Sequence, residues 1–177
     1  MDVVGNFMLS LPKLPFRQKC YLSITFLAGL FIFISFYWTL LEWHNLRAII
    51  FVYGMSVPIF LLAGETVIDL NNQKIFKIWS LVAIIFLIVY LFTRNVSVVY
   101  ERATDLNKAT TSLKALPIFL ISYWPLNNFV KRKTGFYIIN TFRQSVSYNS
   151  IAKRKIKWFD IVTNLILLIV TVLGGAL

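Results

Sequence analysis

Few residues in this chain have side chains that could do chemistry, and they do not form a recognisable catalytic group. His44 is the only histidine among 177 residues, and Cys20 is the only cysteine. Glu42 and Trp43 precede His44, but a zinc site needs three protein ligands and a nucleophile needs an oriented base. We therefore predict no catalytic residue, no metal site, no cofactor and no enzymatic activity, and we interpret His44 as an interfacial side chain.

Two further carboxylates, Glu65 and Asp69, are spaced about one helical turn apart. Side chains at this spacing share one helix face, so the pair could hold a cation. It could also face Lys74 and Lys77, which follow on the same segment. Solvated mixed-charge loops of this second kind are the more common arrangement, and the sequence favours it.

The composition indicates which elements must position these side chains. The chain is 58% hydrophobic, 16% aromatic and only 14% charged, which lies outside the range of soluble domains. A chain of this length with so much apolar sequence leaves no room for a separate soluble catalytic domain. We predict an all-α integral membrane protein with a single membrane domain over residues 1–177. Its predicted architecture is a bundle of four to five transmembrane helices with a basic amphipathic cytoplasmic helix.

Five apolar runs set the predicted spans. They cover about residues 21–41, 48–64, 78–93, 115–130 and 159–177. The first has no ionisable acid or base, and at about 1.5 Å per residue it covers roughly 30 Å of hydrocarbon. The run 115–130 is the least certain, because Pro117 and Pro125 interrupt the backbone hydrogen bonds. It either crosses as a kinked helix or only enters the membrane.

The distribution of charge predicts the orientation. Eight basic residues lie from Lys131 to Lys157, and no acid occurs between Leu106 and Phe159. Such a segment should be cytoplasmic, and so should the N-terminus, which has three basic residues and one acid before the first run. Both placements require an even number of spans between them, so 115–130 should cross. We expect the bacterial inner membrane, with the C-terminus outside.

The tryptophans partly agree with this layout. Trp38 and Trp43 fall at the outer end of the first span, and Trp79 and Trp158 at inner ends. An interfacial belt of aromatic residues would have this arrangement. Trp124 does not fit, because it lies within the run 115–130.

Small and hydroxyl side chains on the first span predict a helix contact. They fall within an arc of about 120° on a helical wheel and are Thr25, Ala28, Gly29, Ser35 and Thr39. Small residues allow two helix backbones to approach closely, and hydroxyls can bond across the contact. The partner helix could belong to the same chain or to a second copy, and packing within the chain is the simpler interpretation.

The segment 131–158 is the predicted binding surface for a partner or for lipid. Ile138, Ile139, Phe142 and Val146 gather on one side of a helical wheel, opposite Asn140, Gln144 and Ser147. This pattern predicts an in-plane amphipathic helix at the headgroups. The residues predicted to bind a partner or lipid are Lys131, Arg132, Lys133, Arg143, Lys153, Arg154, Lys155 and Lys157.

Three classes of ligand can be considered for such a surface, and two of them suit it. The cations can hold anionic lipid headgroups and fix the orientation, or they can dock an acidic cytoplasmic protein. Nucleic acid is disfavoured, because Phe142 and the isoleucines are committed to lipid rather than to stacking with bases.

No acidic or basic side chain occurs in the middle of any predicted span, which disfavours proton-coupled carriers, ion pumps and voltage sensors. We therefore predict a non-catalytic membrane subunit that self-associates as a homo-oligomer, recruits a cytoplasmic partner, or does both. The alternative is a subunit of an oligomeric channel or transport complex. In size and build the chain resembles small bacterial membrane proteins that confer bacteriocin immunity or serve in phage defence, which would imply a role in defence or immunity.

Overall fold

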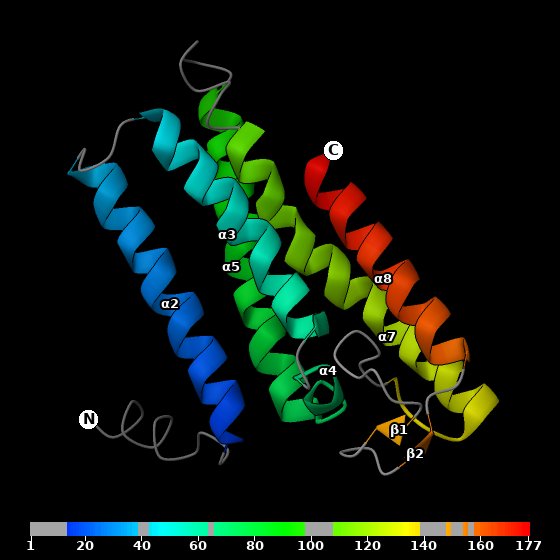
Figure 1. Ribbon diagram of the computed structural model, residues 1–177. Helices are drawn as coiled ribbons and strands as arrows, with labels where there is room; N and C mark the ends of the chain where they lie inside the picture. Colours follow the sequence, from blue (N-terminus) through cyan, green and yellow to red (C-terminus); the bar gives the residue numbers. More distant parts are fainter. Residues whose placement is uncertain are drawn as a thin grey trace.

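The computed structural model describes residues 14–38, 43–63, 66–97, 108–138, 148–149, 154–155 and 158–177. Its helices are α2 (Phe16–Tyr37), α3 (Trp43–Ala63), α4 (Thr66–Asp69), α5 (Gln73–Ser97), the 3-10 helix η1 (Thr111–Lys114), α7 (Ala115–Thr134) and α8 (Trp158–Ala176). Two short strands, β1 (Tyr148–Asn149) and β2 (Arg154–Lys155), pair antiparallel between α7 and α8. The long helices lie alongside one another as a bundle (Figure 1). The predicted all-α class is confirmed.

Four of the described helices are long and apolar enough to cross a membrane, and these are α2, α3, α5 and α8. Both α2 and α5 begin five residues before the predicted apolar runs, because the helices continue through charged residues that a charge-free run leaves out. The side chains of Lys19 and Lys77 are exposed on these added turns. The positions of these four helices agree with four of the predicted apolar runs apart from such end effects.

The proline-containing run forms α7, a continuous helix that lies along α8 in the bundle (Figure 1). Pro117 is in the first turn, where a backbone N–H has no helical partner in any case. Pro125 lies inside the helix and removes one backbone hydrogen bond. The helix is not among the four that are apolar enough to span, since its last turn carries Lys131, Arg132 and Lys133.

Successive long helices run in alternating directions (Figure 1). The start of α2, α4, the end of α7, both strands and the start of α8 lie at one end, which we call the basic end. The C-terminus and the N-terminal ends of α3 and α7 lie at the opposite end. Along the chain, four long helices lie between the N-terminal side of α2 and the basic residues at the end of α7, namely α2, α3, α5 and α7. An even number of passes returns the chain to the same end of the bundle.

The core lies where α3, α5 and α7 meet, and its largest buried side chains include Trp79, Phe119 and Tyr123. Gly54 of α3 allows η1 to pack directly on this helix. A Cβ atom at this position would lie 2.7 Å from the carbonyl carbon of Ser112 and 2.9 Å from the backbone nitrogen of Leu113. Close approach, rather than helix bending, explains this glycine.

Candidate functional site: the basic end of the bundle

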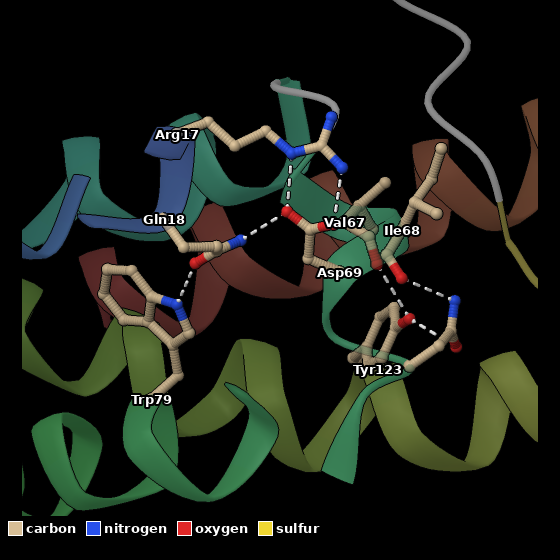
Figure 2. Close-up of polar contacts among 8 residues, drawn as sticks. Arg17, Gln18, Val67, Ile68, Asp69, Trp79 and Tyr123 are labelled. Atoms are coloured by element: carbon tan, nitrogen blue, oxygen red, sulfur yellow. Dashed lines mark hydrogen bonds and ion pairs between the residues drawn. The ribbon is translucent and has the colours of Figure 1, made fainter. Parts of the chain in front are cut away.

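An ion pair joins the first turn of α2 to α4 at the basic end. The Nε atom of Arg17 donates a hydrogen bond to Oδ2 of Asp69 at 2.6 Å, and its Nη2 donates to Oδ1 at 2.5 Å (Figure 2). Two parallel bonds of this kind fix the geometry of both side chains. The predicted pairing of Asp69 with Lys74 and Lys77 is therefore wrong, because α2 packs close enough to supply a nearer cation. Glu65 lies outside the described residues.

Gln18 connects the same carboxylate to α5. Its side chain is fully buried, and its Nε2 donates to Oδ2 of Asp69 at 3.0 Å. Its Oε1 accepts a hydrogen bond of 2.8 Å from the indole Nε1 of Trp79 (Figure 2). The side-chain amide of Gln18 thus provides a hydrogen-bond partner for the carboxylate of Asp69 and for the indole of Trp79. These bonds stabilise the contact of α2 with α4 and α5.

The position of Trp79 corrects one prediction. Its side chain is 1% exposed and lies in the core, so it is not part of an interfacial belt. Its indole N–H finds a protein partner, which is the requirement for burying a tryptophan. Trp38 and Trp158 are exposed near the ends of α2 and α8, and Trp124 is exposed on α7. The side chain of Trp43 is outside the described part.

A second group of hydrogen bonds ties α7 to the segment that joins α4 and α5. The hydroxyl of Tyr123 lies 3.0 Å from the carbonyl oxygen of Val67 and 3.1 Å from Oδ1 of Asn71. Asn127 donates from Nδ2 to the same Oδ1 at 2.7 Å, and its own Oδ1 accepts from the backbone N–H of Ile138 at 2.9 Å. These bonds hold the end of α7 and the chain that follows it against the rest of the bundle.

Ile138 differs from its predicted role. The chain leaves α7 at Gly135, which has a left-handed φ of 77° and ends the helix as glycine commonly does. It then folds back so that Ile138 is buried in the core, outside any helix. It therefore does not face lipid from an amphipathic helix.

The prediction of a basic amphipathic helix over 131–158 is wrong for the described residues of this segment, which form other elements. Lys131, Arg132 and Lys133 belong to the last turn of α7, whereas Arg154 and Lys155 form strand β2. Residues 139–147, which include the predicted apolar face and Arg143, lie outside the described ranges. Lys153 and Lys157 also lie outside them.

The exposed charges described at the basic end are all positive. Lys131, Arg132 and Lys133 are exposed in the last turn of α7. Cations are stabilised there by the negative end of the helix dipole. Lys19, Lys74 and Lys77 are also exposed on the first turns of α2 and α5. The two carboxylates described in the chain do not offset them, because Asp69 pairs with Arg17 and Asp160 is fully buried.

Three of the predicted helix-packing residues of α2, namely Thr25, Ala28 and Gly29, lie against α3 of the same chain. The backbone carbonyl of Thr25 accepts a hydrogen bond of 2.9 Å from the hydroxyl of Tyr53. A Cβ atom on Gly29 would lie 3.0 Å from the same hydroxyl oxygen. Ala28 lines a shallow recess between α2 and α3, and Ser35 is buried. Thr39 lies outside the described residues.

The sequence interpretation missed the polar residues that organise this end, namely Gln18, Asn71, Tyr123 and Asn127. Most of their partners are 51 to 61 positions away in the chain; the local bonds are those of Asn127 to Ile138 and of Asn71 to Ile68. One signal was present, since amide side chains occur at or near the ends of several apolar runs, as at Gln18, Asn71 and Asn127. A buried amide needs a partner, so this pattern favours a shared network.

Comparison of the chain with known protein families, with curated proteins and with solved structures finds no match.

Proposed function

We propose that this chain is a non-catalytic, membrane-spanning subunit whose basic end docks an acidic cytoplasmic protein and holds it at the membrane. One observation carries the proposal, which is the charge asymmetry of the basic end. Six exposed cations lie on α2, α5 and α7 there, while the described carboxylates are paired or buried. A surface with one sign of charge attracts and orients a partner of the opposite sign.

The bundle around this surface suits a bilayer. Large apolar side chains are exposed along α2, α5 and α8, among them Phe26, Phe33, Ile85, Ile88 and Ile166. In water such faces would be a liability, whereas lipid is an apolar solvent for them and the helices satisfy their own backbone groups. The positive-inside rule then puts the basic end in the cytoplasm.

The docking surface is supported by rigid elements. Lys131, Arg132 and Lys133 follow Val130, and both Val130 and Asn127, one turn before Lys131, are buried against the rest of the bundle. The Nζ atom of Lys131 also donates a hydrogen bond of 2.8 Å to the hydroxyl of Tyr137. Cations held on a fixed helix lose less conformational entropy on binding than cations on a free loop.

Anionic lipid is the competing ligand for these cations, since each Lys or Arg near a charged membrane surface contributes about 1 kcal/mol. A lipid headgroup and an acidic protein use the same chemistry at the cation, so binding alone does not separate them. They differ in size and in stoichiometry. The proposal therefore requires a soluble protein in fixed ratio to the chain.

The test is affinity purification of the tagged chain from detergent-solubilised membranes, comparing two charge-neutralised variants. One carries Lys131→Gln, Arg132→Gln and Lys133→Gln at the basic end. The control carries Lys108→Gln and Lys114→Gln, which lie on the segment leading into α7 at the opposite end. Both leave the buried networks intact.

We expect the unaltered chain and the control to recover an acidic soluble protein in fixed ratio. The basic-end variant should recover at least about tenfold less, which corresponds to roughly 1.4 kcal/mol of binding free energy. Recovery from the unaltered chain should also fall as salt is raised, because exposed charges are screened. Equal recovery from both variants, or recovery of lipid alone, would contradict the proposal.

A further inference from the structure

The exposed cations described at the basic end form two groups that are carried by different helices. The first group, which we call the α7 patch, comprises Lys131, Arg132 and Lys133. The second, which we call the α2–α5 patch, comprises Lys19 on the first turn of α2 and Lys74 and Lys77 on the first turns of α5. The second patch exists only if the start of α2 is held beside the start of α5.

Apolar packing holds α2 more weakly than the other three helices that are apolar enough to span. Only 17% of its apolar window is buried, against 28% to 39% for α5, α8 and α3. Along its length it packs on α3, and Phe16 at its start is 82% exposed. Tyr21 and Leu22, one turn farther on, are only partly buried against the core. Apolar contacts therefore do little to fix the start of α2 beside α5.

Polar contacts fix the start of α2 instead. Arg17 donates two hydrogen bonds to the carboxylate of Asp69 (Figure 2). Gln18 donates to the same carboxylate and accepts a bond from the indole of Trp79. Paired bonds between a guanidinium and a carboxylate hold both groups in one geometry. The position of this end of α2 therefore depends on Asp69, which accepts three of these four bonds.

These contacts bring like charges together. Lys19 follows Gln18 directly, and Lys77 lies two positions before Trp79. The hydrogen bond between Gln18 and Trp79 therefore sets the two lysines on adjoining turns of α2 and α5. Cations placed in this way repel each other. The negative charge of Asp69, which accepts bonds from α2, opposes this repulsion and keeps the two helix starts together.

The segment that carries Asp69 is also fixed to α7. The carbonyl oxygen of Val67 and the side chain of Asn71, two positions to either side of Asp69, both lie within hydrogen-bonding distance of the hydroxyl of Tyr123. Asn127, one turn before the α7 patch, donates to Asn71 as well. Asp69 thus stands on a segment that is bonded to α7 on one side and to α2 on the other. The two patches are therefore held at a set spacing.

We propose that Arg17 and Asp69 are positioning residues of the docking surface. Their ion pair fixes Lys19 beside Lys74 and Lys77, so that an acidic protein meets two cationic patches at a set spacing. Cations held in place before binding lose less conformational entropy when the partner arrives. This inference rests on the proposed docking function. It gives Asp69, a negatively charged residue, a role in binding a negatively charged partner, which attraction between charges alone would not give it.

The position of Lys19 is tested first, on the full chain in phosphatidylcholine nanodiscs that hold one copy each. A short bifunctional reagent that joins primary amines should cross-link Lys19 to Lys74 or Lys77, as mapped by mass spectrometry. Asp69→Ala should lower the yield of this cross-link, because Arg17 loses its acceptor. Absence of the cross-link from the unaltered chain, or an equal yield in Asp69→Ala, would overturn the proposal.

The second test measures the affinity of a fluorescent oligoglutamate peptide for the same nanodiscs by fluorescence anisotropy. In the otherwise unaltered chain, Lys19→Gln should weaken binding about threefold, which corresponds to roughly 0.7 kcal/mol. In an Asp69→Ala background the same change should have no effect, because Lys19 is no longer held at the α2–α5 patch. Lys133→Gln on the α7 patch is the matched control, and it should weaken binding equally in both backgrounds.

The outcomes separate this inference from the proposed function. An effect of Lys19→Gln that is equal with and without the carboxylate of Asp69 would overturn the inference and leave the docking function in place. Failure of the peptide to bind the unaltered chain would overturn the docking function and this inference with it. If Asp69→Ala fails to fold, Arg17→Gln breaks the same ion pair and supplies the second background, with the same expected results.

Discussion

The indole N–H of Trp79 donates a 2.8 Å hydrogen bond to the side-chain carbonyl oxygen of Gln18, although the residues are 61 positions apart. Both side chains are buried. The same amide donates to Asp69, which also pairs with Arg17. Loss of a single partner in this network therefore leaves a buried polar group without its hydrogen bond, and such losses are costly.

Replacing Trp79→Phe keeps an aromatic ring but removes the donor to Gln18. We expect a loss of about 1–3 kcal/mol in the free energy of unfolding, because the buried carbonyl oxygen of Gln18 is left unpaired. The measurement is an SDS unfolding titration of the protein in detergent micelles. Trp124→Phe is the matched control, since Trp124 is 62% exposed, and it should change stability by less than about 0.5 kcal/mol. Equal losses in the two variants would show that the hydrogen bond is unimportant.

Asn127 and Asn128 offer a neighbouring pair for the second network. Asn127→Ala removes the bonds to Asn71 and to the N–H of Ile138, so we expect it to destabilise the protein by about 1–3 kcal/mol. Hydrogen exchange at Ile138 should also become faster, because its amide loses its acceptor. Asn128→Ala should leave this exchange rate unchanged. Unaltered protection of Ile138 in the Asn127 variant would argue against the contact.

Gly54 and Gly174 test how rigid the two helix contacts are. A methyl group at Gly54 would meet the backbone of Ser112 and Leu113, whereas one at Gly174 would meet only the movable side chain of Ile118. Gly54→Ala should therefore cost about 1–3 kcal/mol through overpacking. Gly174→Ala should cost clearly less, because the side chain can shift. Thermal unfolding of both variants in the same detergent gives the comparison, and a reversed order would exclude this packing of η1 on α3.

The apolar runs were sufficient to predict the helical class and the positions of α2, α3, α5 and α8. They are local properties of the sequence, because a span needs about 20 apolar residues wherever its neighbours are. The continuity of α7 was harder to predict. Pro117 reads as a helix breaker until its place in the first turn is known.

The contacts between elements could not be predicted in the same way. Lys74 and Lys77 are the nearest cations to Asp69 in sequence, but α2 brings Arg17 to it across 52 positions. Trp79 was placed at the interface from its position near a helix end, whereas the adjoining α2 covers it and supplies Gln18 as a partner. Ile138 follows the helical periodicity of the next residues, but Gly135 turns the chain back into the core. Tertiary packing decided all three cases.

The proposed function requires the basic end to face the cytoplasm and the C-terminus to face the opposite side of the membrane. The most direct measurement is labelling with a membrane-impermeant maleimide in a Cys20→Ser background, with one cysteine introduced by Phe136→Cys or by Leu177→Cys. Both positions are exposed, and neither change alters a charge that sets orientation. We predict that position 136 reacts only in inside-out vesicles and position 177 only in right-side-out vesicles. Labelling of both positions from the same side would contradict this orientation of the bundle.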